Sequence, residues 1–136
     1  MVARSVAAAV LLAAGLTGCA SAAARTQSTP DSRDVAAAQA CAVFDRYLAG
    51  AVATPPAPGD DGPLLAAARG LLVLTPEERT SGQVESAWSH LGTTMLWVTV
   101  SVTNRDHWQT VFDGQEVDAE CHSIPVAAKR AAGYAR

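Results

Sequence analysis

The sequence predicts an all-α protein: a small antiparallel helical bundle closed by one disulfide bond. Apolar residues recur at helical spacing in several segments, and loops rich in proline and glycine separate these segments. Alanine, the best helix former, is the most frequent residue. Apolar residues make up 49% of the 136 residues but aromatic residues only 5%, so we expect a single domain with a thin core.

The first predicted helix begins near Asp31 or Ser32, either of which can cap it. Its apolar face follows steps of three and four residues and consists of Ala37, Cys41, Phe44, Leu48 and Val52. The proline- and glycine-rich segment 54–62 ends this helix in a loop.

Pro63 suits the first position of a second helix. The apolar face of that helix is Leu64, Leu65, Ala68, Leu71 and Leu72. A short third helix follows, in which Thr75 and Glu78 form a capping box around Pro76, and Gly82 ends or kinks it.

The next segment fits two patterns. Helical spacing links Val84, Trp88, Leu91, Met95, Val98 and Val102. Residues 96–103 also alternate between two faces and are rich in β-branched side chains, which is typical of a strand and would give an α+β fold. We favour the helix because its pattern extends over more residues.

A last long helix is predicted after Asp106, its cap. Its apolar stripe is Val111, Gly114, Val117, Cys121 and Ile124, with Trp108 and Phe112 nearby. Pro125 ends it, and residues 126–132 form either a last short turn or a frayed tail.

The N-terminus is typical of a secretory signal. Arg4 precedes an apolar run over residues 6–16, which is shorter than the roughly 20 residues that span a bilayer. The run ends in Leu16, Thr17, Gly18 and Cys19, which together resemble the lipobox of bacterial lipoproteins. The alternatives are an ordinary signal peptide with a chance cysteine, or an uncleaved core helix.

The lipobox resemblance implies that residues 1–18 are a cleaved signal peptide and that Cys19 carries a diacylglyceryl anchor. Two acyl chains hold a protein stably at a membrane. Residues 19–32 are then the lipidated cysteine and a flexible tether of small polar residues, and residues 33–136 are the helical domain. The whole chain resembles small alanine-rich actinobacterial lipoproteins of unassigned function. That resemblance implies a location on the extracytoplasmic side of the cell membrane, but no activity.

Cys41 and Cys121 remain after lipidation of Cys19. Both lie on the apolar stripe of a predicted helix, and in an exported protein this pattern predicts a disulfide bond. Two unpaired buried thiols are the alternative.

No arrangement typical of catalysis, cofactor binding or metal binding stands out. The chain lacks nucleophile-elbow, phosphate-loop and zinc-protease motifs, so we predict no catalytic residue and no cofactor. Glu120, Cys121 and His122 are neighbours, but consecutive helical residues point in different directions, so we predict no metal site. The acidic run Asp113, Glu116, Asp118 and Glu120 is interpreted as one solvated helix face. The net charge of −3 without a basic stripe argues against nucleic acid as a partner.

Trp97 lies off the helical stripe of its segment, so we expect it to be exposed and to mark a contact surface. These observations predict a non-enzymatic, membrane-anchored interaction module that contacts an unknown protein of the cell envelope. The alternative is a small-ligand binder of the envelope in which Trp88, Trp97 and Trp108 line a pocket.

Overall fold

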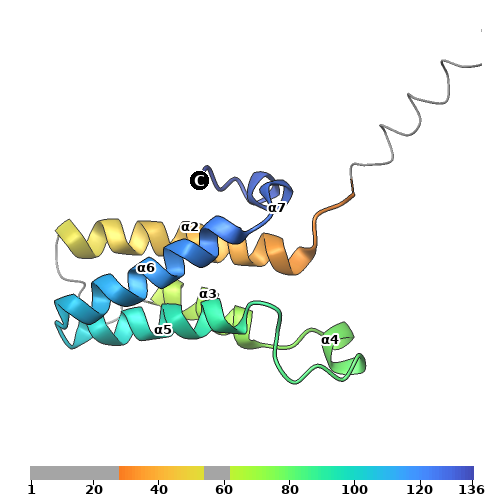
Figure 1. Ribbon diagram of the computed structural model, residues 1–136, viewed down its shortest axis with the longest axis horizontal. Coiled ribbons are helices and arrows are strands. Elements are labelled where there is room, and N and C mark those ends of the chain that lie inside the picture. The colour runs from red at the N-terminus through yellow and green to blue at the C-terminus, as the bar shows by residue number, and fades with distance from the viewer. Residues whose placement is uncertain (1–27, 54–61) are drawn as a thin grey trace, which may run out of the picture.

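The computed structural model describes residues 28–53 and 62–136, and this part of the chain is helical without any strand (Figure 1). The helices are α2 (Ser32–Ala53), α3 (Gly62–Leu72), α4 (Pro76–Thr80), α5 (Ser89–Thr103), α6 (His107–Ser123) and α7 (Val126–Ala131). The predicted all-α class is therefore confirmed, and the strand alternative for residues 96–103 is wrong because they lie inside α5. Residues 1–19, for which the sequence predicts a signal peptide and a lipobox, lie outside the described residues.

The four longer helices, α2, α3, α5 and α6, run antiparallel in succession and form a bundle (Figure 1). The most extensive packing is between α3 and α5 and between α5 and α6, while α2 contacts α3 and, over a smaller area, α6. The short α7 packs on α2. Because the connection between α5 and α6 is short, the end of α5 and the start of α6 lie together at one end of the bundle (Figure 1).

The core contains few large side chains, as the composition predicts. Ala37, Ala38 and Ala40 of α2 are buried, so their small side chains let α2 approach its neighbours closely. The largest fully buried side chains come from all four long helices: Phe44, Leu64, Leu71, Leu91, Met95, Val98 and Val117. The stripes predicted for α2 and α3 are largely confirmed; Leu48 is half-buried, and the Val52 side chain lies outside the described part.

The predicted helix caps are also confirmed. Asp31 Oδ1 accepts a hydrogen bond from the Arg33 backbone N–H at the start of α2. Thr75 and Glu78 form the capping box of α4, with N···O distances of 3.1 and 2.7 Å. Asp106 Oδ1 accepts from the Gln109 N–H at the start of α6. Each bond satisfies an N–H group that a helix leaves unpaired at its first turn.

The predicted start of the helix over 84–103 is wrong, because α5 begins only at Ser89 and Val84 is 91% exposed. Hydrogen bonds to α3 and α2 hold the preceding segment in a loop instead. The buried hydroxyl of Ser86 donates to the Leu71 carbonyl at the end of α3, and Trp88 Nε1 donates to Asp34 Oδ1 at 2.8 Å. The spacing of apolar residues in the sequence cannot predict these tertiary contacts.

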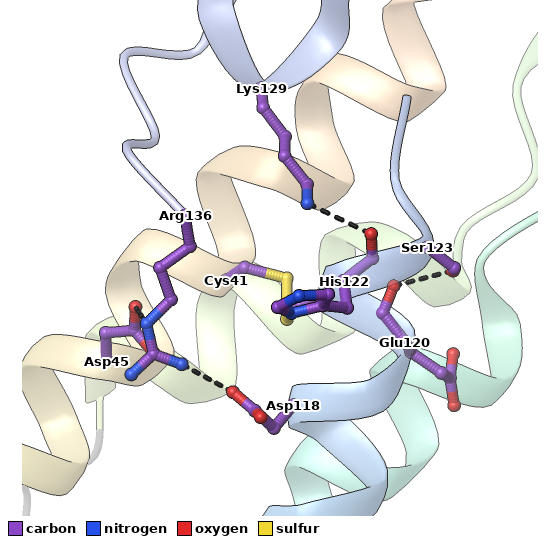
Figure 2. The surroundings of a disulfide bond; sticks show 9 residues. Cys41, Asp45, Asp118, Glu120, His122, Ser123, Lys129 and Arg136 are labelled. Atoms are coloured by element: carbon purple, nitrogen blue, oxygen red, sulfur yellow. Dashed lines mark hydrogen bonds and ion pairs between the residues drawn. A yellow bond between two sulfur atoms is a disulfide. The ribbon is translucent and has the colours of Figure 1, made fainter. Parts of the chain in front are cut away.

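The predicted disulfide between Cys41 and Cys121 is present (Figure 2). It joins α2 to α6 across a Cα–Cα distance of 6.0 Å, and both cysteines are buried. The sequence predicts either a turn or a frayed tail for residues 126–132, and the structure shows the short helix α7, which packs on α2 near this bond (Figure 2). Figure 2 shows Arg136 reaching both Asp45 of α2 and Asp118 of α6. The tail therefore ties the same two helices together.

Candidate functional site

A groove of about 480 Å³ lies between the second half of α5 and the first half of α6. Its lining combines an aromatic ring, a valine and several polar side chains: Trp97, Val100, Ser101, Asn104, Asp106, Gln109 and Asp113. Its volume is within the range of pockets that hold small organic ligands. The antiparallel pairing of α5 and α6 brings these residues together from opposite sides of the connecting turn.

Asp113 is the most unusual residue of the groove, because it is a carboxylate with only 6% of its surface exposed. Its Oδ1 accepts a hydrogen bond from Gln109 Nε2 at 2.7 Å. Its Oδ2 is buried and accepts no hydrogen bond from any residue in the described ranges. A buried carboxylate oxygen without a partner is costly, so this atom is a candidate for contact with a ligand.

The interpretation of the acidic run as one solvated face is therefore wrong at Asp113, although Glu116 and Asp118 are exposed. Asp113 precedes Val117 by one helical turn and so continues the buried stripe formed by Val117, Cys121 and Ile124. The predicted stripe instead contained Val111, which is 43% exposed, and Gly114, which is half-buried. The spacing alone could have identified Asp113, but its charge argued against a buried position.

Exposed apolar side chains gather around this end of the bundle. Eight large hydrophobic residues are exposed in the described chain, and five of them belong to α5 or α6. We call these five the exposed apolar cluster: Trp97, Val100, Trp108, Val111 and Phe112. Trp97 is 59% exposed, as predicted, and Trp108 is 84% exposed. This concentration of exposed apolar side chains makes the end of the bundle a candidate contact surface.

In the part of the chain that the structure describes, the three tryptophans have different surroundings. Only Trp97 lines the groove between α5 and α6. Trp88 lies at the opposite end of α5, where it packs against the core and its indole N–H is bound by Asp34. The ligand-binding alternative therefore rests on Trp97 and its polar neighbours.

The residues weighed as metal ligands have other partners. Cys121 is in the disulfide, and Glu120 forms an ion pair with His90 of α5. This hydrogen-bonded carboxylate raises the pKa of His90 above its ordinary value, against a small opposing effect of burial. Within the described ranges, no group of three or more His, Cys, Asp or Glu side chains is placed to hold a metal ion.

A second depression surrounds the start of α2, where Arg33 lies among acidic side chains. Its guanidinium donates to the carbonyls of Leu71 and Val73 at 3.1 and 3.0 Å, and its Nε lies 3.2 Å from Glu78 Oε1. Hydrogen bonds with the Thr75 and Ala87 backbone and the nearby Arg33 charge lower the pKa of Glu78. Arg33 therefore joins α2 to the end of α3, which is a structural role.

No helix in the described ranges is long and apolar enough to cross a bilayer. No protein family, curated protein or solved structure matches the chain. The candidate site therefore has to be interpreted from its own chemistry.

Proposed function

We propose that the protein is a membrane-anchored extracytoplasmic lipoprotein whose helical domain serves as a non-enzymatic interaction module for another protein of the cell envelope. The lipobox resemblance of Leu16 to Cys19 supports the anchor. The exposed apolar cluster is the observation that carries the interaction, because monomeric proteins rarely leave large apolar patches in water without a use. Tryptophan in particular is enriched among residues that dominate binding energies.

The arrangement of the bundle suits this function. The helix α2 begins at one end of the bundle, and the turn between α5 and α6 lies at the other end (Figure 1). The 22 residues of α2 correspond to a length of about 33 Å. A tether that enters at Ser32 would thus place the exposed apolar cluster at the end of the domain farthest from the anchor.

The anchor is tested by substituting Cys19. In cells fed a labelled fatty acid, the wild-type chain should carry the label and sediment with membranes, whereas Cys19→Ser should do neither. Ser21→Ala changes a nearby residue but keeps Cys19, and it serves as the control, which should retain the label. Label that persists in Cys19→Ser would contradict the proposed anchor.

The interaction surface is tested by photo-crosslinking in intact cells. A photoreactive residue at position 112, in the exposed apolar cluster, should give one discrete crosslinked species. The same residue at position 126 should not, because Val126 is equally apolar and 67% exposed but lies on α7. Trp108→Ser should abolish the crosslink from position 112 without lowering the Tm. Equal crosslinking from both positions, or none from either, would overturn the proposed surface.

A further inference from the structure

We infer that the groove between α5 and α6 binds an organic ammonium ion, with the Asp113 carboxylate and the Trp97 ring as its principal contacts. Asp113 and Trp97 both line the groove, one from each helix. The inference names a ligand class for a site within the exposed apolar cluster and does not depend on the lipid anchor or on a protein partner.

The charges that line the groove favour a cation. Asp106 and Asp113 both contribute carboxylates, and Arg, Lys and His are absent from the lining residues described. Asp113 is more than nine-tenths buried, and its Oδ2 has no hydrogen-bond partner in the described chain. An ammonium group supplies both the opposite charge and, when it carries N–H groups, the missing donor.

Trp97 supplies the second element of ammonium recognition. A cation placed over an indole ring is attracted by the negative face of the π system, and tryptophan is the most effective residue for this contact. Trp97 is 59% exposed, so much of the residue is open to a ligand. Val100 lies one turn further along α5 and adds an apolar surface for the carbon portion of the ligand.

A bare metal ion fits this groove less well than an organic cation. Zinc and calcium sites are built from three or more protein ligands, and no such group of acidic, His or Cys side chains occurs in the described ranges. The amide groups of Asn104 and Gln109 can fix the orientation of a polar organic ligand. The volume of about 480 Å³ also suits a small molecule or a side chain rather than a single ion.

The test is a titration of the full chain with choline, followed by NMR of the three indole N–H signals. Choline should shift the Trp97 signal in a saturable manner and leave the Trp88 signal unchanged. Its uncharged carbon isostere, dimethylbutanol, should bind at least about tenfold more weakly, because it lacks the charge that both contacts recognise. N-acetyl-lysine amide, which presents the ammonium group as a protein side chain does, is titrated in parallel. Tighter binding of choline would identify a small molecule as the source of the ammonium group, and tighter binding of N-acetyl-lysine amide would identify a lysine side chain.

Two substitutions assign the contacts. Asp113→Asn should weaken binding of the tighter cation about tenfold or more, whereas Glu116→Gln removes a charge from the exposed face of the same helix and should change it less than twofold. Trp97→Leu should weaken binding of the cation, whereas Trp108→Leu should not. In these variants, binding is measured from the chemical shifts of the cation. This pair of variants tests the inference even if Asp113→Asn does not fold. Equal binding of choline and dimethylbutanol, or saturable shifts from neither cation, would overturn the inference. The crosslinking experiment at position 112 tests the proposed protein interaction independently of these results.

Discussion

At the scale of single residues, Arg105 adopts a backbone conformation that favours glycine. Its φ is 57°, and it follows the end of α5. The Arg105 and Asp106 N–H groups donate to the carbonyls of Val102 and Ser101, which is the hydrogen-bond pattern of a Schellman C-cap. The equivalent positions after α4 and α7 are Gly82 and Gly133, both with positive φ. Arg105 therefore carries a steric strain that glycine avoids.

We predict that Arg105→Gly raises the free energy of unfolding by about 1 kcal/mol, since the strain at this position disappears. Urea unfolding followed by circular dichroism measures the change. Arg105→Ala retains a Cβ atom and should give no comparable gain. A gain of the same size in both variants would show that the arginine side chain, and not the backbone, is unfavourable here.

The ion pair between His90 and Glu120 predicts a pH dependence. The pKa of His90 is raised, first by its hydrogen bond to Glu120 and then by the Glu120 charge. Because the folded pKa exceeds the ordinary value of 6.5, the stabilisation is fully present below about pH 6.5 and is lost as the pH rises through the raised pKa. The effect on stability is small, since the His90 side chain is 74% exposed.

The titration of the His90 ring signals by NMR measures this pKa directly. Glu120→Gln removes the ionic acceptor and should lower the pKa of His90 towards its ordinary value. Glu116→Gln should lower it much less, because Glu116 contributes only a weak charge effect. An unchanged His90 pKa in Glu120→Gln would show that the pair does not form in solution.

At the scale of helices, the sequence predicts most elements, since the apolar spacing of α2 and α3 and the capping residues of α2, α4 and α6 are local features. The start of α5 is not predicted, because the loop before it is held by bonds from Ser86 to α3 and from Trp88 to α2. The short α7 is equally hard to predict. A helix of six residues is unstable alone, and here it depends on buried Ala128 and Tyr134 and on the ion pairs of Arg136.

The contact between α3 and α5 depends on a glycine. A Cβ atom at Gly92 would lie 2.7 Å from the Ala68 carbonyl oxygen, which belongs to the backbone of α3 and cannot turn aside. We therefore predict that Gly92→Ala lowers the free energy of unfolding by about 1–3 kcal/mol, because the helices must separate.

Gly114, in the middle of α6, is the matched control for Gly92. A Cβ atom there meets nothing within 4 Å, so Gly114→Ala should raise stability by about 0.5–1 kcal/mol through helix propensity alone. Urea unfolding of both variants should thus give changes of opposite sign. Stabilisation by Gly92→Ala would show that α3 and α5 can separate without cost.

At the scale of the whole molecule, the candidate site was only partly predictable. The exposure of Trp97 followed from its place off the apolar stripe. The groove itself did not, because it depends on how α5 and α6 pack and on the turn between them. The charge of Asp113 predicts a surface position, yet its helical position places it towards the core. Sequence spacing locates a residue on a helix, but only the packed neighbours decide whether that face is covered.

The disulfide bond is the feature on which the closed bundle most depends. It joins α2 to α6, whose mutual contact is smaller than the contacts of α5 with α3 and with α6. Cys41 and Cys121 are 80 residues apart, so the chain-entropy model gives a stabilisation of about 4.5 kcal/mol. This is a large share of the roughly 5–15 kcal/mol typical of a domain.

We therefore expect the double variant Cys41→Ala, Cys121→Ala to melt at a much lower temperature than the wild-type chain or to remain partly unfolded. Reductant should lower the Tm of the wild-type chain and leave that of the double variant unchanged. In a Cys19→Ser background, thiol titration after denaturation should find no reactive thiol before reduction and two after it. Two reactive thiols without reduction would refute the bond. A double variant as stable as the wild type would instead show that Arg136 and α7 suffice to hold α2 against α6.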